Sequence, residues 1–211
     1  MAADPLIIGD DGRARCAWGD HPAIYRAYHD DEWGRPVTDD IRLFEKLSLE
    51  GFQAGLSWLT ILRKREAFRA AFVGFDPARL AAFTPQDVTR LLTDASIVRH
   101  RGKIEAVIHN AGCALELIAS EGSLAAFVWA YEPRGTEADP AAPRAQSAAS
   151  RALARELRRR GWRFVGPTTV HSFLQAMGLV NEHVPGCVIR AEVDAARRAL
   201  LRPAGGPPAA A

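Results

Sequence analysis

One acidic side chain on the apolar face of a predicted helix limits what this chain can fold into. Helical spacing starts at Ile41 and aligns apolar residues on one side of the segment, namely Leu43, Leu47, Ala54, Trp58 and Ile61. Glu50 lies inside the same arc, where a carboxylate is costly unless the structure uses it. The stretch 49–58 also contains residues that permit close backbone approach or offer polar groups: Gly51, Gln53, Gly55 and Ser57. It therefore predicts one wall of a pocket, with a structural ion pair at Glu50 and ordinary core packing of Trp58 as the alternatives.

Composition sets wide limits around this stretch. The 211 residues are 48% hydrophobic and 25% charged, which suits one compact domain or two small lobes. The formal net charge of +2 is too small to establish nucleic-acid binding by itself. The sequence contains no apolar run of about 18 residues and no secretory signal, so we expect no membrane span. Three cysteines do not form a disulfide framework, and a reducing cytoplasmic location is expected.

The remaining pattern predicts a nearly all-α fold. Asp76 followed by Pro77 indicates one helix start, because an acidic cap before a proline at the first helical position is typical there. Thr84 with Asp87 three residues later indicates a second start. Only Phe164–Val165 hints at a strand.

The chain is expected to divide into a leader, a globular part and a tail. Residues 1–12 suggest a flexible leader, and residues 13–190 form the globular domain. Within this domain, residues 132–150 are rich in Pro, Ala, Gly and charge and predict a surface loop. Residues 191–211 are an extension, with disorder expected beyond about residue 202 because the composition there is of low complexity.

Two Cys/His pairs near the ends of the domain could form a metal site. Cys16 and His29 lie near its start, and His183 and Cys187 lie near its end. Two thiolates and two imidazoles make a tetrahedral set that suits Zn²⁺. The pairs are more than 150 residues apart, so spacing alone cannot join them, and inert thiols with ordinary histidines are the alternative. A metal ion bound by all four side chains would have no open coordination position for water, so the site would be structural.

A short basic segment could bind phosphate. Gly102 stands at a predicted helix start, where backbone N–H groups and the helix dipole favour an anion, and it is flanked by Arg99, Arg101 and Lys103. The segment resembles the hairpin of helix-hairpin-helix DNA-binding modules, although a basic helix start is usually only solvated. Residues 155–163 carry a further arginine cluster, which is a weak nucleic-acid signal and more often a solvated face.

Aromatic residues concentrate before and within the pocket stretch: Trp18, Tyr25, Tyr28, Trp33 and Trp58. Aromatic side chains usually build core, but such a group could also sandwich a flat ligand such as a base. The sequence lacks the residue order of a Ser/His/Asp catalytic triad, a phosphate-binding loop and the glycine-rich motif of dinucleotide-binding proteins.

Five blocks in uninterrupted order resemble one known family, the type I 3-methyladenine DNA glycosylases. These blocks are Cys16–Trp18, Tyr28–Gly34, Glu50–Trp58, Arg99–Ile104 and Gly178–His183. The resemblance covers about residues 13–187 and implies the fold of the helix-hairpin-helix DNA glycosylase superfamily, with two helical lobes around a cleft. It also implies flipping and excision of 3-methyladenine from alkylated double-stranded DNA by a monomer, which leaves an abasic site.

The resemblance also implies roles for individual residues. A structural zinc, held by Cys16, His29, His183 and Cys187, would clip the two ends of the domain together. Glu50 would read the damaged base, and the base would be enclosed by the polar and aromatic side chains Tyr28, Trp58, Trp18, Trp33 and Gln53. Gly55 and Leu56 would push into the duplex. The hairpin residues Arg99, Arg101, Gly102 and Lys103 would contact the DNA backbone.

The implied chemistry is electrostatic. Methylation at N3 makes the base cationic, and a buried anionic Glu50 would favour that cation over neutral adenine. No lysine is expected in the pocket, so hydrolysis without a Schiff-base lyase step is predicted. The aspartate that superfamily relatives use after the hairpin is missing, and Ser96, His171 and a longer tail also depart from the family pattern. A non-catalytic DNA-binding module and a catalytic metal remain the rival interpretations.

Overall fold

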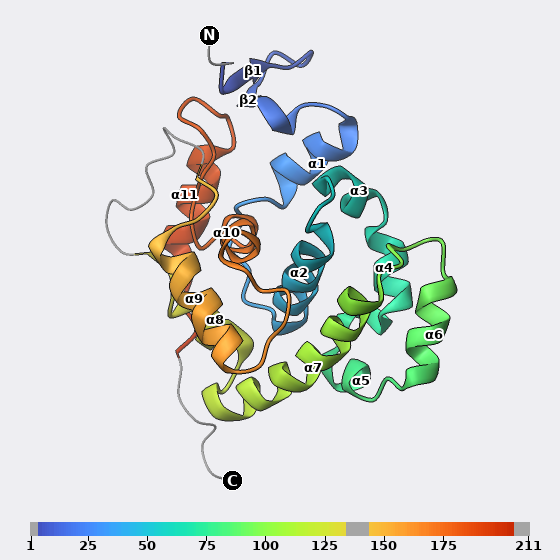
Figure 1. Ribbon diagram of the computed structural model, residues 1–211. Helices are drawn as coiled ribbons and strands as arrows, with labels where there is room; N and C mark the ends of the chain where they lie inside the picture. The colour runs from blue at the N-terminus through green and yellow to red at the C-terminus, as the bar shows by residue number, and fades with distance from the viewer. Residues whose placement is uncertain (1–3, 134–143, 205–211) are drawn as a thin grey trace.

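The computed structural model describes residues 4–133 and 144–204 and is mostly helical. Helix α2 (Asp40–Gln53) lies at the centre of the molecule, between two groups of helices (Figure 1). The first group comprises α3 (Trp58–Arg63), α4 (Arg65–Ala71), α5 (Pro77–Ala81), α6 (Pro85–Thr93) and α7 (Arg101–Glu121). The second comprises α8 (Leu124–Trp129), α9 (Ala148–Arg159), α10 (Pro167–Ala176) and α11 (Arg190–Ala199). Helix α1 (Ala23–Asp31) and the short 3₁₀ helices η1 (Ala17–Gly19) and η2 (Val73–Phe75) complete the set.

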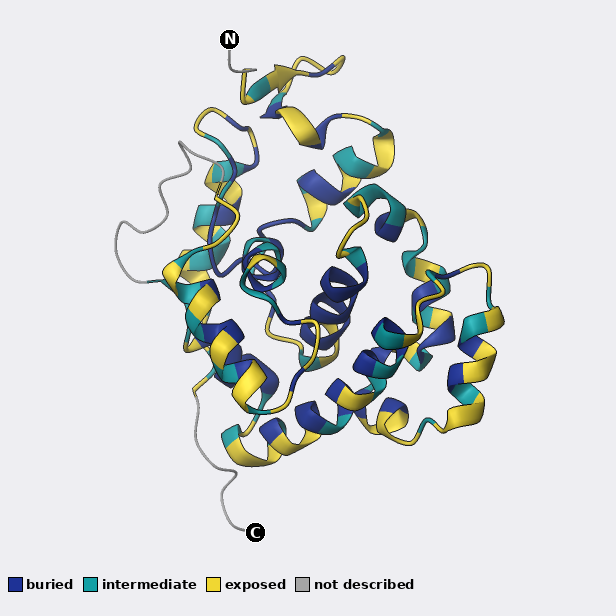
Figure 2. Ribbon diagram, in the orientation of Figure 1, coloured by how far each residue is buried: buried dark blue, intermediate teal, exposed yellow. Residues whose placement is uncertain are grey.

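The predicted central helix is confirmed, and it is buried along most of its length. The Asp39 side chain caps it by accepting a hydrogen bond from the Arg42 N–H at 2.8 Å. Buried residues run without a break from Leu43 to Phe52, because neighbouring helices cover several faces of α2 (Figure 2). The polar groups of α2, Glu50 among them, therefore lie inside the protein.

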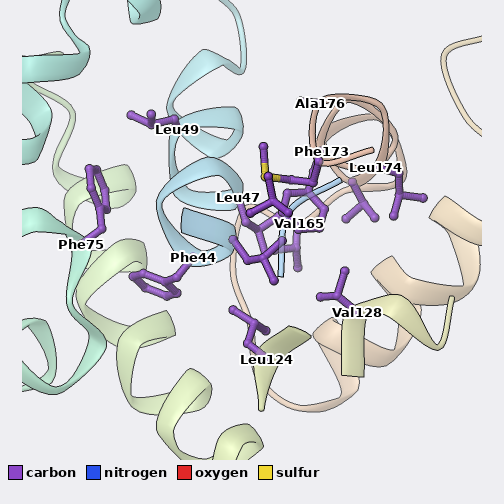
Figure 3. Close-up of a cluster of buried hydrophobic side chains, with 14 of the residues drawn as sticks. Phe44, Leu47, Leu49, Phe75, Leu124, Val128, Val165, Phe173, Leu174 and Ala176 are labelled. Atoms are coloured by element: carbon purple, nitrogen blue, oxygen red, sulfur yellow. The ribbon is translucent and has the colours of Figure 1, made fainter. Parts of the chain in front are cut away.

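The core joins α2 to the second group of helices. Phe44 and Leu47 of α2 lie near side chains of α8 and α10 in one apolar cluster, which includes Leu124, Val128, Phe173, Leu174 and Ala176 (Figure 3). Phe75 lies at the other side of α2 in the same view. Because α2 is packed on both sides, it is a rigid support for the side chains near its end.

Both helix starts that were predicted from caps are confirmed. The Asp76 carboxylate accepts a hydrogen bond from the Ala78 N–H at 2.9 Å at the start of α5. Thr84 and Asp87 form a capping box at the start of α6. Helix α9 begins at Ala148, inside the segment expected to be a loop, because Ser147 and Ser150 form a capping box there. Residues 134–143 of that segment lie outside the described residues.

The leader differs from the prediction. Residues Leu6–Ile8 form strand β1, which pairs antiparallel with β2 (Ala14–Cys16), whereas residues 1–12 were expected to be flexible. A buried arginine explains the order: Arg15 is 1% exposed, and its guanidinium donates hydrogen bonds to Asp11 and Asp30. In the tail, α11 makes residues 191–199 of the extension helical, and residues 205–211, where disorder was expected, lie outside the described residues.

Phe164–Val165, where the sequence only hinted at a strand, does not form one. Both residues lie in the turn before α10, and Phe164 has a positive φ of 56°. A bulky residue in this region of backbone space is unusual, and an alternating apolar pattern cannot reveal it.

Candidate base pocket and metal centre

A cavity of about 680 Å³ opens beside the end of α2. All six side chains proposed from the sequence to enclose a base line it: Trp18, Tyr28, Trp33, Glu50, Gln53 and Trp58. They come from η1, α1, the turn after α1, α2 and the start of α3, so the fold assembles the pocket from segments 40 residues apart in the chain. Sequence reasoning missed lining residues from later in the chain, among them Ser172 and Gln175 of α10 and Glu182.

Glu50 is buried and already has a partner. Its side chain is 5% exposed, and the Lys46 Nζ lies 2.8 Å from Glu50 Oε1. The ion pair that was the alternative for Glu50 is therefore present, and the carboxylate also lines the cavity. Both roles apply to the same side chain.

Lys46 lies next to the pocket, although it does not line the large cavity. Its ammonium donates a hydrogen bond to the Tyr28 hydroxyl at 2.7 Å and lies 3.3 Å from the centre of the Trp58 ring. Lys46 lines a small hollow of about 30 Å³ and is not among the residues that line the large cavity, whereas Tyr28 and Trp58 line both. The ammonium thus lies behind the aromatic wall, where it is held by Glu50 and Tyr28. The signal in the sequence was a lysine four residues before Glu50 on one helix.

Aromatic rings that line the cavity pack against one another with their planes tilted, not parallel. The Tyr28 and Trp58 rings are 5.4 Å apart at 45°, and the Trp18 and Trp33 rings are 4.9 Å apart at 83°. Burial, and then the charge of Glu50, raise the pKa of Tyr28 well above its usual value. Tyr28 is therefore a neutral phenol, and the pocket combines aromatic surfaces with one carboxylate–ammonium pair.

The four residues predicted to bind metal meet in one buried cluster. Cys16, His29, His183 and Cys187 place their ligand atoms within 4.8 Å of one another, so the cluster could hold a metal ion. The His183 Nδ1 lies 3.2 Å from the His29 Nε2 and 3.5 Å from the Cys187 Sγ. The hydrogen bond that the two sulfurs share lowers the pKa of Cys187 and raises that of Cys16. The termini of the domain are therefore brought together by the side chains that sequence spacing could not join.

The second ring nitrogen of each histidine has its own partner. The His29 Nδ1 lies 2.7 Å from Asp30 Oδ1, and the His183 Nε2 lies 3.1 Å from the Trp33 carbonyl oxygen. Such partners fix which nitrogen faces a metal. Gly19 allows the close approach of η1, because a Cβ there would lie 2.4 Å from the His29 ring.

The predicted hairpin lies between α6 and α7. Gly102 is in the first turn of α7, and the His100 side chain caps that helix by accepting from the Lys103 N–H. Arg99 and Arg101 are exposed, as a phosphate-binding role requires. Lys103 differs: it is 7% exposed, and its Nζ donates to the Phe52 and Ala54 carbonyl oxygens at 2.9 and 2.6 Å. Its ammonium is bound to the end of α2 and not presented to solvent.

The segment between α2 and α3 exposes the residues expected to enter the duplex. Gly55 has a φ of 81°, a value that favours glycine, and Leu56 is 41% exposed. This turn follows the helix that carries Glu50, so an inserted side chain would be adjacent to the pocket.

The arginine cluster of residues 155–163 is partly neutralised. Arg159 and Arg160 both pair with Glu156, at 2.6 and 2.9 Å, and Arg160 also pairs with Glu121. These contacts favour the interpretation of a solvated helix face for this cluster.

Comparison with known proteins identifies a family that shares these features. The sequence profile of the methyladenine glycosylase family matches residues 18–191. DNA-3-methyladenine glycosylase 1 of Escherichia coli (strain K12) is 49% identical over 177 residues, which are 82% of this chain and 95% of that protein. The DNA-3-methyladenine glycosylase of Haemophilus influenzae is 40% identical over 82% of this chain and 96% of its own.

Solved structures give the same result. A crystal structure of 3-methyladenine DNA glycosylase I matches 82% of this chain and 98% of its own at 49% identity, with a TM-score of 0.76. The enzyme from Staphylococcus aureus, in a structure on the recognition of 3-methyladenine, matches 83% of this chain and 96% of its own at 39% identity, with a TM-score of 0.78. Within the described residues, no helix is long and apolar enough to cross a bilayer.

Proposed function

This chain belongs to the methyladenine glycosylase family, and we propose that it performs the family's reaction through Glu50 and the rings around it. The protein excises 3-methyladenine from alkylated DNA and leaves an abasic site. The observation that carries the residue assignment is a buried carboxylate in an aromatic cavity of about 680 Å³.

The pocket suits a flipped, methylated purine. A base inside a duplex is out of reach, so it must be extruded at a cost of a few kcal/mol. Tyr28 and Trp58, with Trp18 and Trp33 beside them, offer aromatic surfaces to the flat ring, and Gln53 adds a polar contact. N3-methylation gives the base in DNA a positive charge, which weakens its bond to the sugar and attracts it to Glu50. Water then completes the hydrolysis. The Lys46 ammonium is held behind the wall by Glu50 and Tyr28, so it does not offer a free nucleophile for a lyase step.

Double-stranded DNA containing alkylated adenine is the proposed substrate. Leu56 would enter the space left by the base, with Gly55 providing the turn that presents it. The N–H groups around Gly102, with Arg99 and Arg101, would hold a backbone phosphate. We also propose that the enzyme acts as a monomer, as the family resemblance implies.

We propose that the ion in the Cys₂His₂ cluster is Zn²⁺ and that it is structural. Tetrahedral zinc with sulfur and nitrogen ligands separates its ligand atoms by about 3.3–3.8 Å, given its usual bond lengths. The distances in the cluster, 3.2 Å between the two imidazole nitrogens and 3.5–3.8 Å from nitrogen to sulfur, agree with that geometry. The four ligands leave no position for water, which argues against a catalytic metal. Because thiolate ligands need reducing conditions, a cytoplasmic location is proposed as well.

Release of 3-methyladenine tests the pocket assignment. Alkylated duplex DNA is incubated with the protein, and the released bases are identified by chromatography. We expect 3-methyladenine from the wild type and at least about a hundredfold slower release from Glu50→Gln. Glu45→Gln is the matched control, because Glu45 lies on the same helix but pairs with Arg69 and does not line the cavity. Full activity of Glu50→Gln would remove Glu50 from the mechanism. Binding of alkylated DNA without base release by the wild type would instead favour a non-catalytic module.

A further inference from the structure

We propose that Lys46 is a built-in counter-ion of Glu50 that weakens the grip of the pocket on the cationic base, and thereby speeds the departure of that base. This inference rests on the proposed role of Glu50. It assigns Lys46 as a positioning and charge-setting residue, because it acts through Glu50 and lies behind the wall that would touch the base.

The geometry gives Lys46 few alternatives to this role. Its side chain is 7% exposed, and its Nζ lies 2.8 Å from Glu50, 2.7 Å from the Tyr28 hydroxyl and 3.3 Å from the Trp58 ring centre. These three partners are the carboxylate and the two rings that are proposed to hold the base. One ammonium therefore contacts each of the principal groups of the pocket from behind.

The charged groups around Lys46 come from several helices. Glu50 lies on its own helix, Glu32 follows α1, and Arg65 begins α4, where it pairs with Glu32 at 2.5 Å. Burial lowers the pKa of Lys46 below its usual value, and the charge and hydrogen bond of Glu50 oppose that shift only in part. Since Glu32 and Arg65 offset each other, the pair of Lys46 and Glu50 carries almost no net charge, although Glu50 alone would carry −1.

The movement of charge during the reaction explains why a neutral pair is useful. The methylated base attached to sugar carries one positive charge. When the C1′–N9 bond breaks, its electron pair stays on N9, so the base leaves neutral and the positive charge passes to the sugar. Water adds to C1′ and releases a proton to solvent. Glu50 assists cleavage because the positive charge remains in the site on the sugar, but an unpaired carboxylate would also hold the cationic base more tightly than the departing neutral base and would deepen the ground state. The Lys46 ammonium reduces that ground-state stabilisation.

Lys46→Met tests this inference, because methionine keeps the length of the side chain and removes its charge. Kinetics on alkylated duplex DNA should show KM and kcat both lowered by about tenfold, with kcat/KM nearly unchanged, as expected when ground-state destabilisation is removed. Lys46→Arg keeps the charge and should behave like the wild type. Lys46→Gln serves as a second neutral variant, and thermal unfolding verifies that each protein is folded.

A binding experiment isolates the charge effect from catalysis. The probes are 3,9-dimethyladenine, which carries a fixed positive charge like the base in DNA, and 3-methyladenine at a pH where it is neutral. Quenching of tryptophan fluorescence should show that Lys46→Met binds the cation about tenfold more tightly and the neutral base almost equally. In the Glu50→Gln background, the protein with Lys46 and the Lys46→Met variant should each bind the cation more weakly than their Glu50 counterparts, because the carboxylate that attracts it is absent.

The outcomes separate this inference from the proposed function. An active wild type whose neutral Lys46 variants show unchanged or raised KM, or no gain in affinity for the cation, would overturn the role of Lys46 only. A wild type that releases no 3-methyladenine, or a fully active Glu50→Gln, would overturn the proposed function itself.

Discussion

The Cys₂His₂ cluster and the aromatic pocket are neighbours, and both contain buried polar groups. His29 belongs to the cluster and Tyr28 to the pocket, one residue apart on α1, and Cys16 borders the cavity. In the cluster, four ligand atoms converge within 4.8 Å, and the outer nitrogens of both histidines have partners. In the pocket, the polar groups surround about 680 Å³ of space. Polar groups that face one another close a site and hold the fold together, whereas polar groups that face a cavity remain available for a substrate.

This comparison predicts that damage to the cluster lowers stability and that damage to the pocket lowers activity. The largest effect is expected from Cys187→Ala. Loss of one metal ligand should lower the free energy of unfolding by several kcal/mol and release the ion, since metal binding and folding are coupled. Thermal unfolding and metal content measure this. Cys113→Ala is the matched control, because Cys113 is also buried but lies outside the cluster. Equal losses in the two variants would contradict a metal role for Cys187.

Two tryptophan variants separate an effect on activity from an effect on stability. Trp58→Leu should lower kcat/KM on alkylated DNA by roughly 5–150-fold, the range that loss of one stacking surface gives. Trp162→Leu should instead lower the unfolding temperature, because Trp162 is 3% exposed in the core and does not line the cavity. If Trp58→Leu were destabilised as much as Trp162→Leu while its activity was retained, the pocket role of Trp58 would be wrong.

The exposed leucine beside the pocket is expected to act on DNA alone. Leu56→Ala should reduce kcat/KM on duplex DNA by about tenfold, because the space left by the base would lose its apolar filler. Binding of free 3-methyladenine should stay the same. Leu115→Ala provides the comparison, since this leucine on α7 is similarly exposed, at 38% against 41% for Leu56. A loss of affinity for the free base would place Leu56 in the pocket and not in the duplex.

The smallest effect is expected at the hairpin. Arg101→Ala should weaken binding to all duplex sequences and reduce the slope of log K against log salt by about one, as loss of one phosphate contact does. Arg159→Ala, from the cluster that pairs with Glu156, should leave this slope unchanged. Titrations at several salt concentrations measure both. A reduced slope for Arg159→Ala would extend the DNA-binding surface to α9.

The sequence predicts the pocket better than it predicts the chain ends, because the features that reveal the pocket lie in neighbouring residues of the chain. Glu50 is recognisable because it interrupts a helical stripe, and Asp76 and Thr84 are recognisable because helix caps depend on adjacent residues. The partners of Cys16 and Arg15 depend on the tertiary fold, so the metal cluster needed family resemblance and the β1–β2 hairpin was missed. Lys46 was missed although its spacing from Glu50 was visible, because helical spacing does not show whether a lysine extends to solvent or turns inward.

The bond from Lys103 to the end of α2 has a mechanical consequence. This one ammonium ties the first turn of the hairpin helix to the carbonyl oxygens of Phe52 and Ala54, immediately before the turn that carries Leu56. The hairpin, which is proposed to hold a phosphate, and Leu56, which is proposed to enter the duplex, are therefore held at a fixed distance from each other. Under the proposed function, this fixed distance would determine how far from the held phosphate a nucleotide must lie to reach the mouth of the cavity.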